Sequence, residues 1–298
     1  MTGIMRGKIV VITGATSGIG QSAAERLAAK GARIIQIARD RNRGAWAQAR
    51  LEQIAPTLEH AIHYADLSLL SEVSEVAKTI CATEPRIDVL INNAGAIFST
   101  RGLTSEGLER TFALNHMAYF GLTLLLLARL RDCAPARIIN TASDAHAAAT
   151  LDFDDLQSAV PYGRRDWVTM LRHGGPAYEV YARSKLCNVL FTRALAQRLA
   201  GTGVTANSVH PGFVATRFAD DAGGLIAFGM RIAKRFARPA SRGAETLVYL
   251  ASSPEVAGTS GLYFHDRVPA SPSPAALQDV AAERLWQESM QLWARFSR

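Results

Sequence analysis

Short apolar runs rich in Val and Ile alternate with longer amphipathic stretches along most of the chain. The run 8–13 is β-branched and ends at a glycine turn, which is typical of a buried strand. The next stretch, 22–30, has the composition of a helix and stops at Gly31. The remaining predicted strands are 33–38, 60–64, 87–91, 136–141, 204–209 and 261–264, and the remaining predicted helices are 44–54, 70–83, 108–131, 178–200 and 242–251.

Repeated strand–helix units predict a parallel sheet that is covered by helices on both faces. The fold class is therefore α/β, a Rossmann-type doubly wound sheet of about seven strands. No linker interrupts the alternation, so we expect a single domain over residues 1–298. Only 269–274, which is rich in proline and serine, has a composition that favours disorder.

Composition and charge exclude several classes of function. Apolar residues make up 48% of the chain and charged residues 20%, as in an ordinary globular protein with a large core. The formal charge of +7 would suit nucleic acid or an anionic membrane, but the arginines are scattered and form no basic stripe with interleaved aromatics. We therefore expect no nucleic-acid partner. Contact with a membrane surface is not expected either, although the arginines and Lys234 of the segment 219–238 would permit a weak one. His60 and His63 lie on opposite faces of a predicted strand, so no metal site is expected.

The cysteines and the apolar segments bear on the compartment. Three widely spaced cysteines, an odd number, indicate free thiols in a reducing environment. The N-terminus lacks a signal-peptide pattern, and the longest apolar patch, 117–128, is too short to cross a bilayer. A cytoplasmic protein is expected. The cysteines are Cys81, Cys133 and Cys187.

A glycine-rich turn lies where the first predicted strand meets the first helix. Gly14 permits the tight turn, Gly18 lets a pyrophosphate approach the backbone, and Gly20 lets the helix pack against the sheet. The N-terminus of that helix can then bind the anion. The turn predicts a dinucleotide site, whose other expected contacts are Thr16, Ser17 and Ile19.

The end of the second strand selects between the two nicotinamide dinucleotides. Arg39 at this position suits a ribose 2′-phosphate and favours NADP(H) over NAD(H). Asp40 follows, and it could instead bind the ribose or pair with a neighbouring arginine. Asp66 and Leu67, after the third strand, are placed to hold the adenine, although Asp66 could equally cap the next helix.

Tyr181 and Lys185 are four residues apart in the predicted helix 178–200, so they share one face of it. The lysine charge can lower the pKa of the phenol, which makes Tyr181 a usable general acid or base near neutral pH. Tyr178 is the rival tyrosine, but no lysine lies four residues after it.

Further motifs occur along the chain after the glycine turn, namely Asp66-Leu67, Asn92-Asn93-Ala94-Gly95, Asn115, Ser143, Tyr181, Lys185 and Pro211-Gly212-x-Val214-x-Thr216. Together with Gly14 to Gly20, and in this order, these motifs resemble the short-chain dehydrogenase/reductase superfamily over nearly the whole chain. The segments 37–40, 112–120, 184–191 and 210–212 narrow the likeness to the retinol dehydrogenase and WW-domain oxidoreductase branch, although no WW domain precedes the fold. The tail segments 261–264 and 282–286 agree.

The resemblance implies a role for each catalytic residue. Tyr181 would protonate a carbonyl oxygen, or take the proton from an alcohol in the reverse direction. Lys185 would lower the tyrosine pKa and bind the nicotinamide ribose, and Tyr181 would also contact the cofactor. Ser143 would orient the substrate oxygen, and Asn115 would hold a water that relays protons from the lysine. Ser143 could instead cap a turn, with Thr141 as its substitute, and Asn115 could satisfy a local carbonyl.

The resemblance also implies further contacts. Asn92, Asn93, Ala94 and Gly95 would border the adenosine ribose, or else only hold the sheet together. Pro211, Gly212, Val214 and Thr216 would contact the nicotinamide carboxamide, or form an ordinary Pro-Gly turn. A homodimer or homotetramer would form through the helices 108–131 and 178–200.

Two segments near the expected site bear on the substrate. The insert at about 150–177 is unusually long, and its part 158–177 is either a surface excursion or a wall of the substrate pocket or a subunit contact. The segment at about 217–240 resembles a substrate lid with an apolar cover, which favours a hydrophobic substrate. His146 is a further candidate for the pocket border.

The leading expectation is an NADP(H)-dependent carbonyl reductase or alcohol dehydrogenase that acts on a small molecule. One alternative is a regulator or scaffold that binds the cofactor but has weak chemistry, although such proteins usually lack the tyrosine or the lysine. Another is epimerisation or dehydration on a related fold, for which the tail is short.

Overall fold

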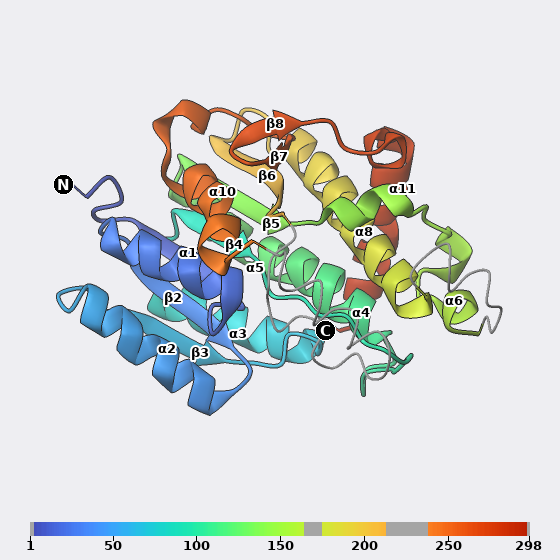
Figure 1. Ribbon diagram of the computed structural model, residues 1–298, viewed down its shortest axis with the longest axis horizontal. Coiled ribbons are helices and arrows are strands. Elements are labelled where there is room, and N and C mark those ends of the chain that lie inside the picture. The colour runs from blue at the N-terminus through green and yellow to red at the C-terminus, as the bar shows by residue number, and fades with distance from the viewer. Residues whose placement is uncertain (1–2, 164–174, 213–237, 297–298) are drawn as a thin grey trace.

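An eight-stranded sheet runs through the fold, with the strand order β3-β2-β1-β4-β5-β6-β7-β8 (Figure 1). The computed structural model describes residues 3–163, 175–212 and 238–296. Strands β1 to β7 are parallel, and β8 pairs with β7 in the antiparallel direction. The strands are β1 Ile9–Thr13, β2 Arg33–Ala38, β3 Ala61–Tyr64, β4 Val89–Asn92, β5 Ala136–Thr141, β6 Val204–His210, β7 Tyr263–His265 and β8 Val268–Ala270.

Helices cover both faces of this sheet, which confirms the doubly wound fold. Val10 and Ile12 of β1 pack in the apolar cluster beneath α1, α2 and α10. Val11 points the other way, into the cluster beneath α3, α5 and α8. The strand order reverses between β1 and β4, so the carboxyl ends of these strands form the crevice where such folds bind ligands. The helices are α1 Gly18–Ala29, α2 Arg41–Ile54, α3 Leu70–Thr83, α5 Ala118–Asp132, α8 Pro176–Arg198 and α10 Ala240–Ser252.

The last strand was not expected from the sequence. A turn at Asp266 and Arg267, with φ of 48° and 68°, joins β7 to β8. Glycine or asparagine normally marks such a left-handed turn, and Pro269 argues against a strand, so the hairpin has little sequence signal. The expectation of disorder at 269–274 is wrong, because β8 and the 3-10 helix Pro274–Leu277 occupy this region.

The single helix expected at 108–131 is three consecutive pieces. The short helix α4 Arg110–Phe112 leads into a π-helical turn, Ala113–Met117, which continues as α5. Together they form 23 helical residues that contain an 18-residue window with a mean hydropathy of 1.4, which is long and apolar enough to span a membrane by length and composition alone. The expectation that no segment here could cross a bilayer rested on the patch 117–128 alone, and it is wrong for the longer helix that contains this patch. Its most apolar window is 72% buried, which gives it a core position in this fold.

A C-terminal helix, α11 Asp279–Trp293, also escaped the sequence prediction. Figure 1 shows α11 in dark red alongside α8 in yellow. Gly121 of α5 accommodates this helix, because a Cβ there would lie 2.1 Å from the Trp293 ring. Helix α11 therefore covers part of the surface of α5 and α8 that the sequence prediction assigned to subunit contact.

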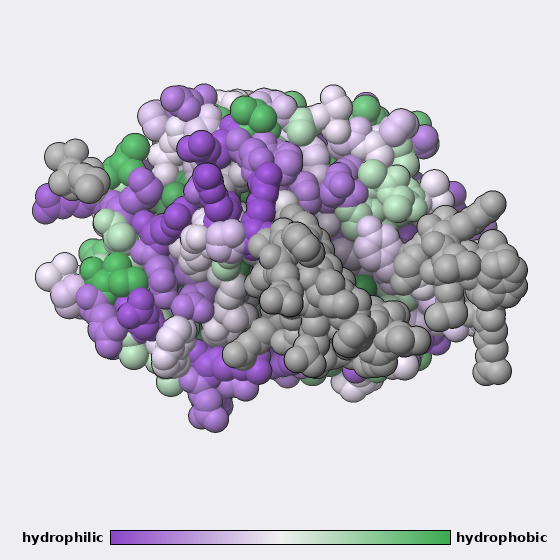
Figure 2. All heavy atoms as spheres, viewed as in Figure 1, coloured by the Kyte–Doolittle hydropathy of each residue, from purple (hydrophilic) through white to green (hydrophobic). Residues whose placement is uncertain are grey.

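In the part of the chain that the structure describes, the most exposed large hydrophobic residues lie on separate elements. The most exposed are Trp46 on α2, Val268 on β8 and Val280 on α11, which belong to three separate elements. On the face in Figure 2, the coloured residues are mainly hydrophilic, with small separate hydrophobic patches. Single exposed apolar side chains are normal in globular proteins.

Candidate active site

The glycine turn between β1 and α1 brings the backbone unusually close to the end of β4. Gly14 has φ +67°, and a Cβ there would lie 2.9 Å from the Cα of Ala94. A Cβ on Gly20 would lie 2.3 Å from the carbonyl oxygen of Gly14. Neither position has room for a side chain, so α1 starts directly above the strand ends.

The N-terminus of α1 is suited to an anion. Its N-cap residue, Ser17, makes no side-chain hydrogen bond to the helix, and the first turn contains no acidic residue. The first backbone N–H groups of a helix have no intrahelical acceptor and carry a partial positive charge. A pyrophosphate could accept hydrogen bonds from them, which is how this turn would hold a dinucleotide.

The ends of β1 and β4 are joined by a compact set of hydrogen bonds. Thr13 Oγ1 accepts from the backbone N–H groups of Asn93 and Ala94, at 2.8 and 2.9 Å. Asn93 Nδ2 donates to the Thr13 carbonyl at 3.2 Å. These contacts hold the strand ends that border the crevice, together with the following Gly95.

Asn92 belongs to the interior of the sheet. It has no exposed surface, and its Nδ2 donates to Thr123 Oγ1 and Asn140 Oδ1. Asn140 in turn donates to Thr192 Oγ1 on α8. Asn92 therefore links the sheet to its helices, and its expected contact with the cofactor is not supported because no ligand can reach it.

Arg39 and Asp66 face each other at the ends of β2 and β3. The Arg39 side chain is 70% exposed, and its Nη1 lies 4.0 Å from Asp66 Oδ2. Asp40 instead caps α2, because its Oδ1 accepts from the Arg43 backbone N–H. Of the two residues, Arg39 is thus the one whose side chain extends towards the Asp66 position. Leu67 is buried in the core.

Asp66 does not cap α3, contrary to one interpretation of its position. Its Oδ1 accepts from the backbone N–H and the hydroxyl of Ser68, which forms a local turn. The N-terminus of α3 is capped by Glu106, whose carboxylate accepts from the backbone N–H groups of Leu70 and Ser71. A carboxylate more than thirty residues away carries no local signal in the sequence, so this cap could not be predicted.

Ser143, Tyr181 and Lys185 come together at the carboxyl end of β5. Tyr181 hydrogen-bonds to Ser143 through their side chains. The Lys185 ammonium donates to the Thr141 carbonyl at 2.9 Å and lies 5.6 Å from the centre of the Tyr181 ring. The Ser143 hydroxyl also accepts from the Ala145 backbone N–H and so caps a short 3-10 helix. Ser143 thus has the capping role as well as the contact with the tyrosine.

Burial disfavours the charged forms of both groups. It lowers the pKa of Lys185 to about 7. It also raises the pKa of Tyr181 above its ordinary value, and the hydrogen bond with Ser143 only partly opposes this. The expected lowering of the tyrosine pKa by the lysine is therefore not what these surroundings produce. A neutral lysine beside a neutral tyrosine is the favoured pair at alkaline pH.

The rival tyrosine lies at the mouth of this group. The centre of the Tyr178 ring is 6.5 Å from that of Tyr181, and Tyr178 is 38% exposed. Burial and the charge of Asp144 raise the pKa of Tyr178. Of the two, Tyr181 is the one beside both Ser143 and Lys185, as the sequence spacing indicated.

Asn115 sits in the middle of the π-helical turn. Its Oδ1 accepts from the Ala96 backbone N–H, and its Nδ2 donates to the Ala96 carbonyl and to Ser184 Oγ, all at 2.9 Å. A Cβ on Gly95 would lie 3.1 Å from Asn115 Oδ1 and 3.5 Å from Lys185 Nζ. Asn115 is therefore next to the lysine, and it satisfies local backbone groups as the alternative interpretation proposed. Its water-holding role stays a prediction.

His146 is buried and is held by hydrogen bonds on both sides of its ring. Its Nδ1 is 2.6 Å from the Ser143 carbonyl, and its Nε2 accepts from the Ser273 backbone N–H. The ring is 2% exposed and both nitrogens are engaged. It fastens the segment after β8 to the strand end that carries Ser143.

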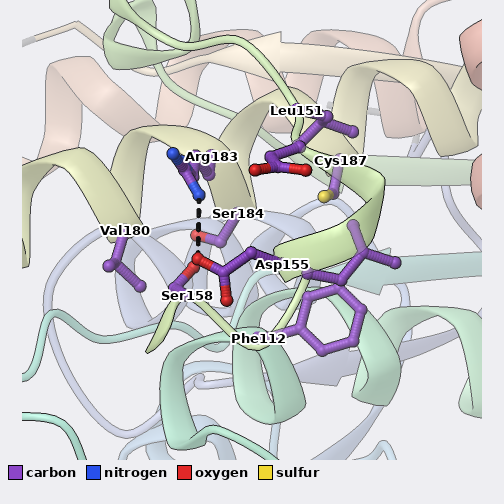
Figure 3. A pocket seen from close by; sticks show the side chains of 10 residues that line it. Phe112, Leu151, Asp155, Ser158, Val180, Arg183, Ser184 and Cys187 are labelled. Atoms are coloured by element: carbon purple, nitrogen blue, oxygen red, sulfur yellow. Dashed lines mark ion pairs between the residues drawn. The ribbon is translucent and has the colours of Figure 1, made fainter. Parts of the chain in front are cut away.

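The first part of the insert is anchored to α8. Asp155 forms an ion pair with Arg183, with Oδ2 and Nη1 3.8 Å apart (Figure 3). Both residues line a small cavity, together with Val180, Ser184 and Cys187 of α8. The short helix α6, Ala159–Gly163, follows, and Tyr162 donates from its hydroxyl to the Phe98 carbonyl at 3.1 Å.

Several predicted residues fall outside the described ranges. Val214 and Thr216 do, as do nearly all of the expected lid and the stretch 164–174 of the insert. Pro211 and Gly212 follow β6, and Gly212 has φ +83°. Among residues 3–163, 175–212 and 238–296, no group of three metal-ligating side chains occurs.

Comparison with known proteins places the chain in a family. A family model described as short chain dehydrogenase matches residues 8–151, and one described as Enoyl-(Acyl carrier protein) reductase matches 168–265. Human retinol dehydrogenase 12 is 38% identical over 96% of this chain and 86% of its own length. Human retinol dehydrogenase 14 is 37% identical with the same coverage, and human retinol dehydrogenase 13 is 38% identical.

Solved structures agree with the fold. A crystal structure of an uncharacterized protein from Mycobacterium Paratuberculosis superposes with a TM-score of 0.75 and 31% identity, over 97% of this chain and 94% of that one. RhlG from Pseudomonas aeruginosa, solved as an active-site complex with NADP, gives 0.67 and 25% identity over 93% and 99%. The chain belongs to the short-chain dehydrogenase/reductase superfamily and is a homologue of retinol dehydrogenases 12, 13 and 14.

Proposed function

We propose that the protein is an NADP(H)-dependent oxidoreductase that interconverts a carbonyl group and an alcohol on a hydrophobic small molecule. The observation that carries this proposal is the meeting of Tyr181, Ser143 and Lys185 at the carboxyl end of β5. Three groups that can donate or hold a proton gather there, beside the crevice of a doubly wound sheet.

The residues present fit a nicotinamide dinucleotide. At Gly14 and Gly20 there is no side chain, so a pyrophosphate can come close to the backbone. The start of α1 has no side-chain cap, so its N–H groups are available to bind that pyrophosphate. Lys185 is placed to bind a ribose hydroxyl next to the reacting ring. The dinucleotide would supply the hydride, and the chain's own residues would handle the proton.

Each catalytic side chain has a defined task in this mechanism. In reduction, Tyr181 donates its hydroxyl proton to the carbonyl oxygen, and in oxidation it accepts the alcohol proton. Ser143 stabilises the oxygen as negative charge develops on it. Lys185 then returns a proton to the tyrosine, and Asn115, next to the lysine at Gly95, holds the path to solvent.

Arg39 supports NADP(H) over NAD(H). Its guanidinium projects from the end of β2 with 70% of the side chain exposed, and a 2′-phosphate could form a bidentate pair with it. Asp40 uses one carboxylate oxygen to cap α2, which makes it a poorer ribose ligand. The NADP complex of RhlG agrees with this preference.

The relatives guide the choice of substrate. Several are retinol dehydrogenases, so long apolar alcohols and aldehydes are the first compounds to test. The assay would follow NADPH oxidation with retinaldehyde and a panel of aldehydes, ketones and quinones. We expect turnover with NADPH that exceeds turnover with NADH. Tight NADPH binding without turnover on any substrate would favour a regulatory protein instead.

We also propose a cytoplasmic protein that forms a homodimer or homotetramer. Cys81, Cys133 and Cys187 are free thiols, which suits a reducing compartment. Because α11 covers part of α5 and α8, a subunit contact through these helices would have to use their remaining surface or include α11. Cell fractionation and light scattering on the purified protein test the two points separately.

A further inference from the structure

A buried histidine that the mechanism does not use lies next to Asn115. His116 has no exposed surface, and burial lowers its pKa to about 3, so the ring is neutral at physiological pH. Its Nε2 lies 2.8 Å from Ser289 Oγ on α11, and Ser289 is also fully buried. One neutral hydrogen bond thus ties the C-terminal helix to the turn that carries Asn115.

The turn itself needs such support. A π-helical turn widens the helix by one residue, is rare, and is found mostly as a single turn at functional sites. Consecutive residues in a helical turn project in different directions, so Asn115 and His116 leave the turn on different sides. Asn115 is held by Ala96 and Ser184, and His116 is held by Ser289. The turn is therefore clamped from two sides.

Within the described ranges, Ser289 is the one hydrogen-bond partner of the His116 ring. Phe112 and Phe191 pack against the ring, with centroids 5.2 and 6.0 Å away. The Nδ1 atom is buried without a hydrogen-bond partner among the described residues. If the Ser289 hydroxyl were lost, both ring nitrogens would be unpaired in an apolar pocket, which is costly enough to shift the turn.

We propose that Ser289 is a positioning residue, which acts through His116 to hold the π-helical turn and thereby fixes Asn115 beside Lys185. This inference rests on the proposed function, because it assigns the hydrogen bond a purpose in proton relay. It gives the C-terminal helix a part in the active site through the hydrogen bond to His116.

The first test compares Ser289→Ala with Leu285→Val on the same helix. Leu285 is fully buried and loses one methylene, so this control weakens the packing of α11 but keeps the hydrogen bond. We expect both variants to lose a similar amount of Tm. Only Ser289→Ala should lose kcat, by about tenfold, and its KM for NADPH should be unchanged. Equal kcat in the two variants would overturn the proposal.

The second test combines Ser289→Ala with Asn115→Ala. If Ser289 acts through Asn115, its loss should cost nothing more in kcat once Asn115 is gone. Additive losses would overturn the proposal. If Ser289→Ala does not yield folded protein, His116→Phe replaces it, because the phenyl ring preserves the packing and removes the hydrogen bond.

The third test does not depend on turnover. Amide hydrogen exchange at 113–117 should be about tenfold faster in Ser289→Ala than in Leu285→Val, because the clamp is open. Unchanged exchange would overturn the clamp, whatever the activity. Faster exchange in a protein whose wild type has no reductase activity would instead refute the proposed function and leave the clamp in place.

Discussion

The Lys185 ammonium donates to the Thr141 carbonyl at 2.9 Å, at the end of the same strand that leads to Ser143. The same ammonium lies 5.6 Å from the centre of the Tyr181 ring, one turn away on the same helix. A helix and a strand are therefore locked together at the point where the reaction is proposed to occur. Burial of Lys185 lowers its pKa, and the prediction on pH-dependent stability below follows from that shift.

Removing the tyrosine hydroxyl should abolish proton transfer and leave the cradle for the cofactor. We expect Tyr181→Phe to lower kcat by about 10³-fold or more, with the Kd for NADPH unchanged. Tyr178→Phe is the matched control, since Tyr178 is nearby and more exposed and should retain activity. Steady-state kinetics and fluorescence titration measure the two quantities. Substantial turnover in Tyr181→Phe would contradict the mechanism.

Burial of Lys185 should make stability depend on pH. Its pKa is about 7 in the folded protein, and an ordinary lysine has 10.5. The unfolded chain binds the extra proton between these values, so the stability contributed by this group rises with pH across this window and is lowest below pH 7.

Lys185→Met removes this dependence. The measured quantity is the free energy of unfolding of the variant minus that of the wild type. It should be larger at about pH 6.5 than at about pH 9.5, by roughly 3 kcal/mol. Urea unfolding at both pH values measures it. The lost bond to Thr141 adds a constant offset, so only the change with pH counts. A difference that grows with pH would disprove the assignment.

Cofactor preference should depend on Arg39. Arg39→Ala should raise the KM for NADPH by about 10- to 100-fold, the range of a lost charge-assisted hydrogen bond, and should hardly affect NADH. Arg43→Ala removes an equal charge from the same exposed segment and serves as the control. If both variants raise the KM for NADPH equally, Arg39 acts only through the overall positive charge of this segment and not by binding the 2′-phosphate.

Helix α11 should be sensitive to one glycine. Gly121→Ala places a Cβ 2.1 Å from the Trp293 ring, and such overpacking costs about 1–3 kcal/mol. The control is Gly258→Ala, where a Cβ would have no neighbour within 4 Å. We expect a clear loss of Tm for the first variant and little change for the second. If Gly121→Ala has the same Tm as Gly258→Ala, the packing of α11 against Gly121 is wrong.

Local sequence was enough to predict the parts of the fold that repeat a short-range pattern. The strands 33–38 and 136–141 and the helix 70–83 agree with the structure residue for residue. The Tyr181–Lys185 spacing also predicted a shared helix face. Such features depend on residues within one or two turns of each other, where steric and hydrogen-bonding rules act directly.

Tertiary structure decided the features that join distant segments. Glu106 caps α3, Trp293 fits over Gly121, and Ser289 reaches His116 across most of the chain length. None of these three contacts can be predicted from the local sequence, because a glutamate, a tryptophan or a serine at such a position is compatible with many other structures. The pKa of Lys185 belongs with them, since desolvation depends on every element packed around the ammonium. The sequence by itself thus determined which groups do the proposed chemistry, and the packing of the whole chain decided how they are held and charged.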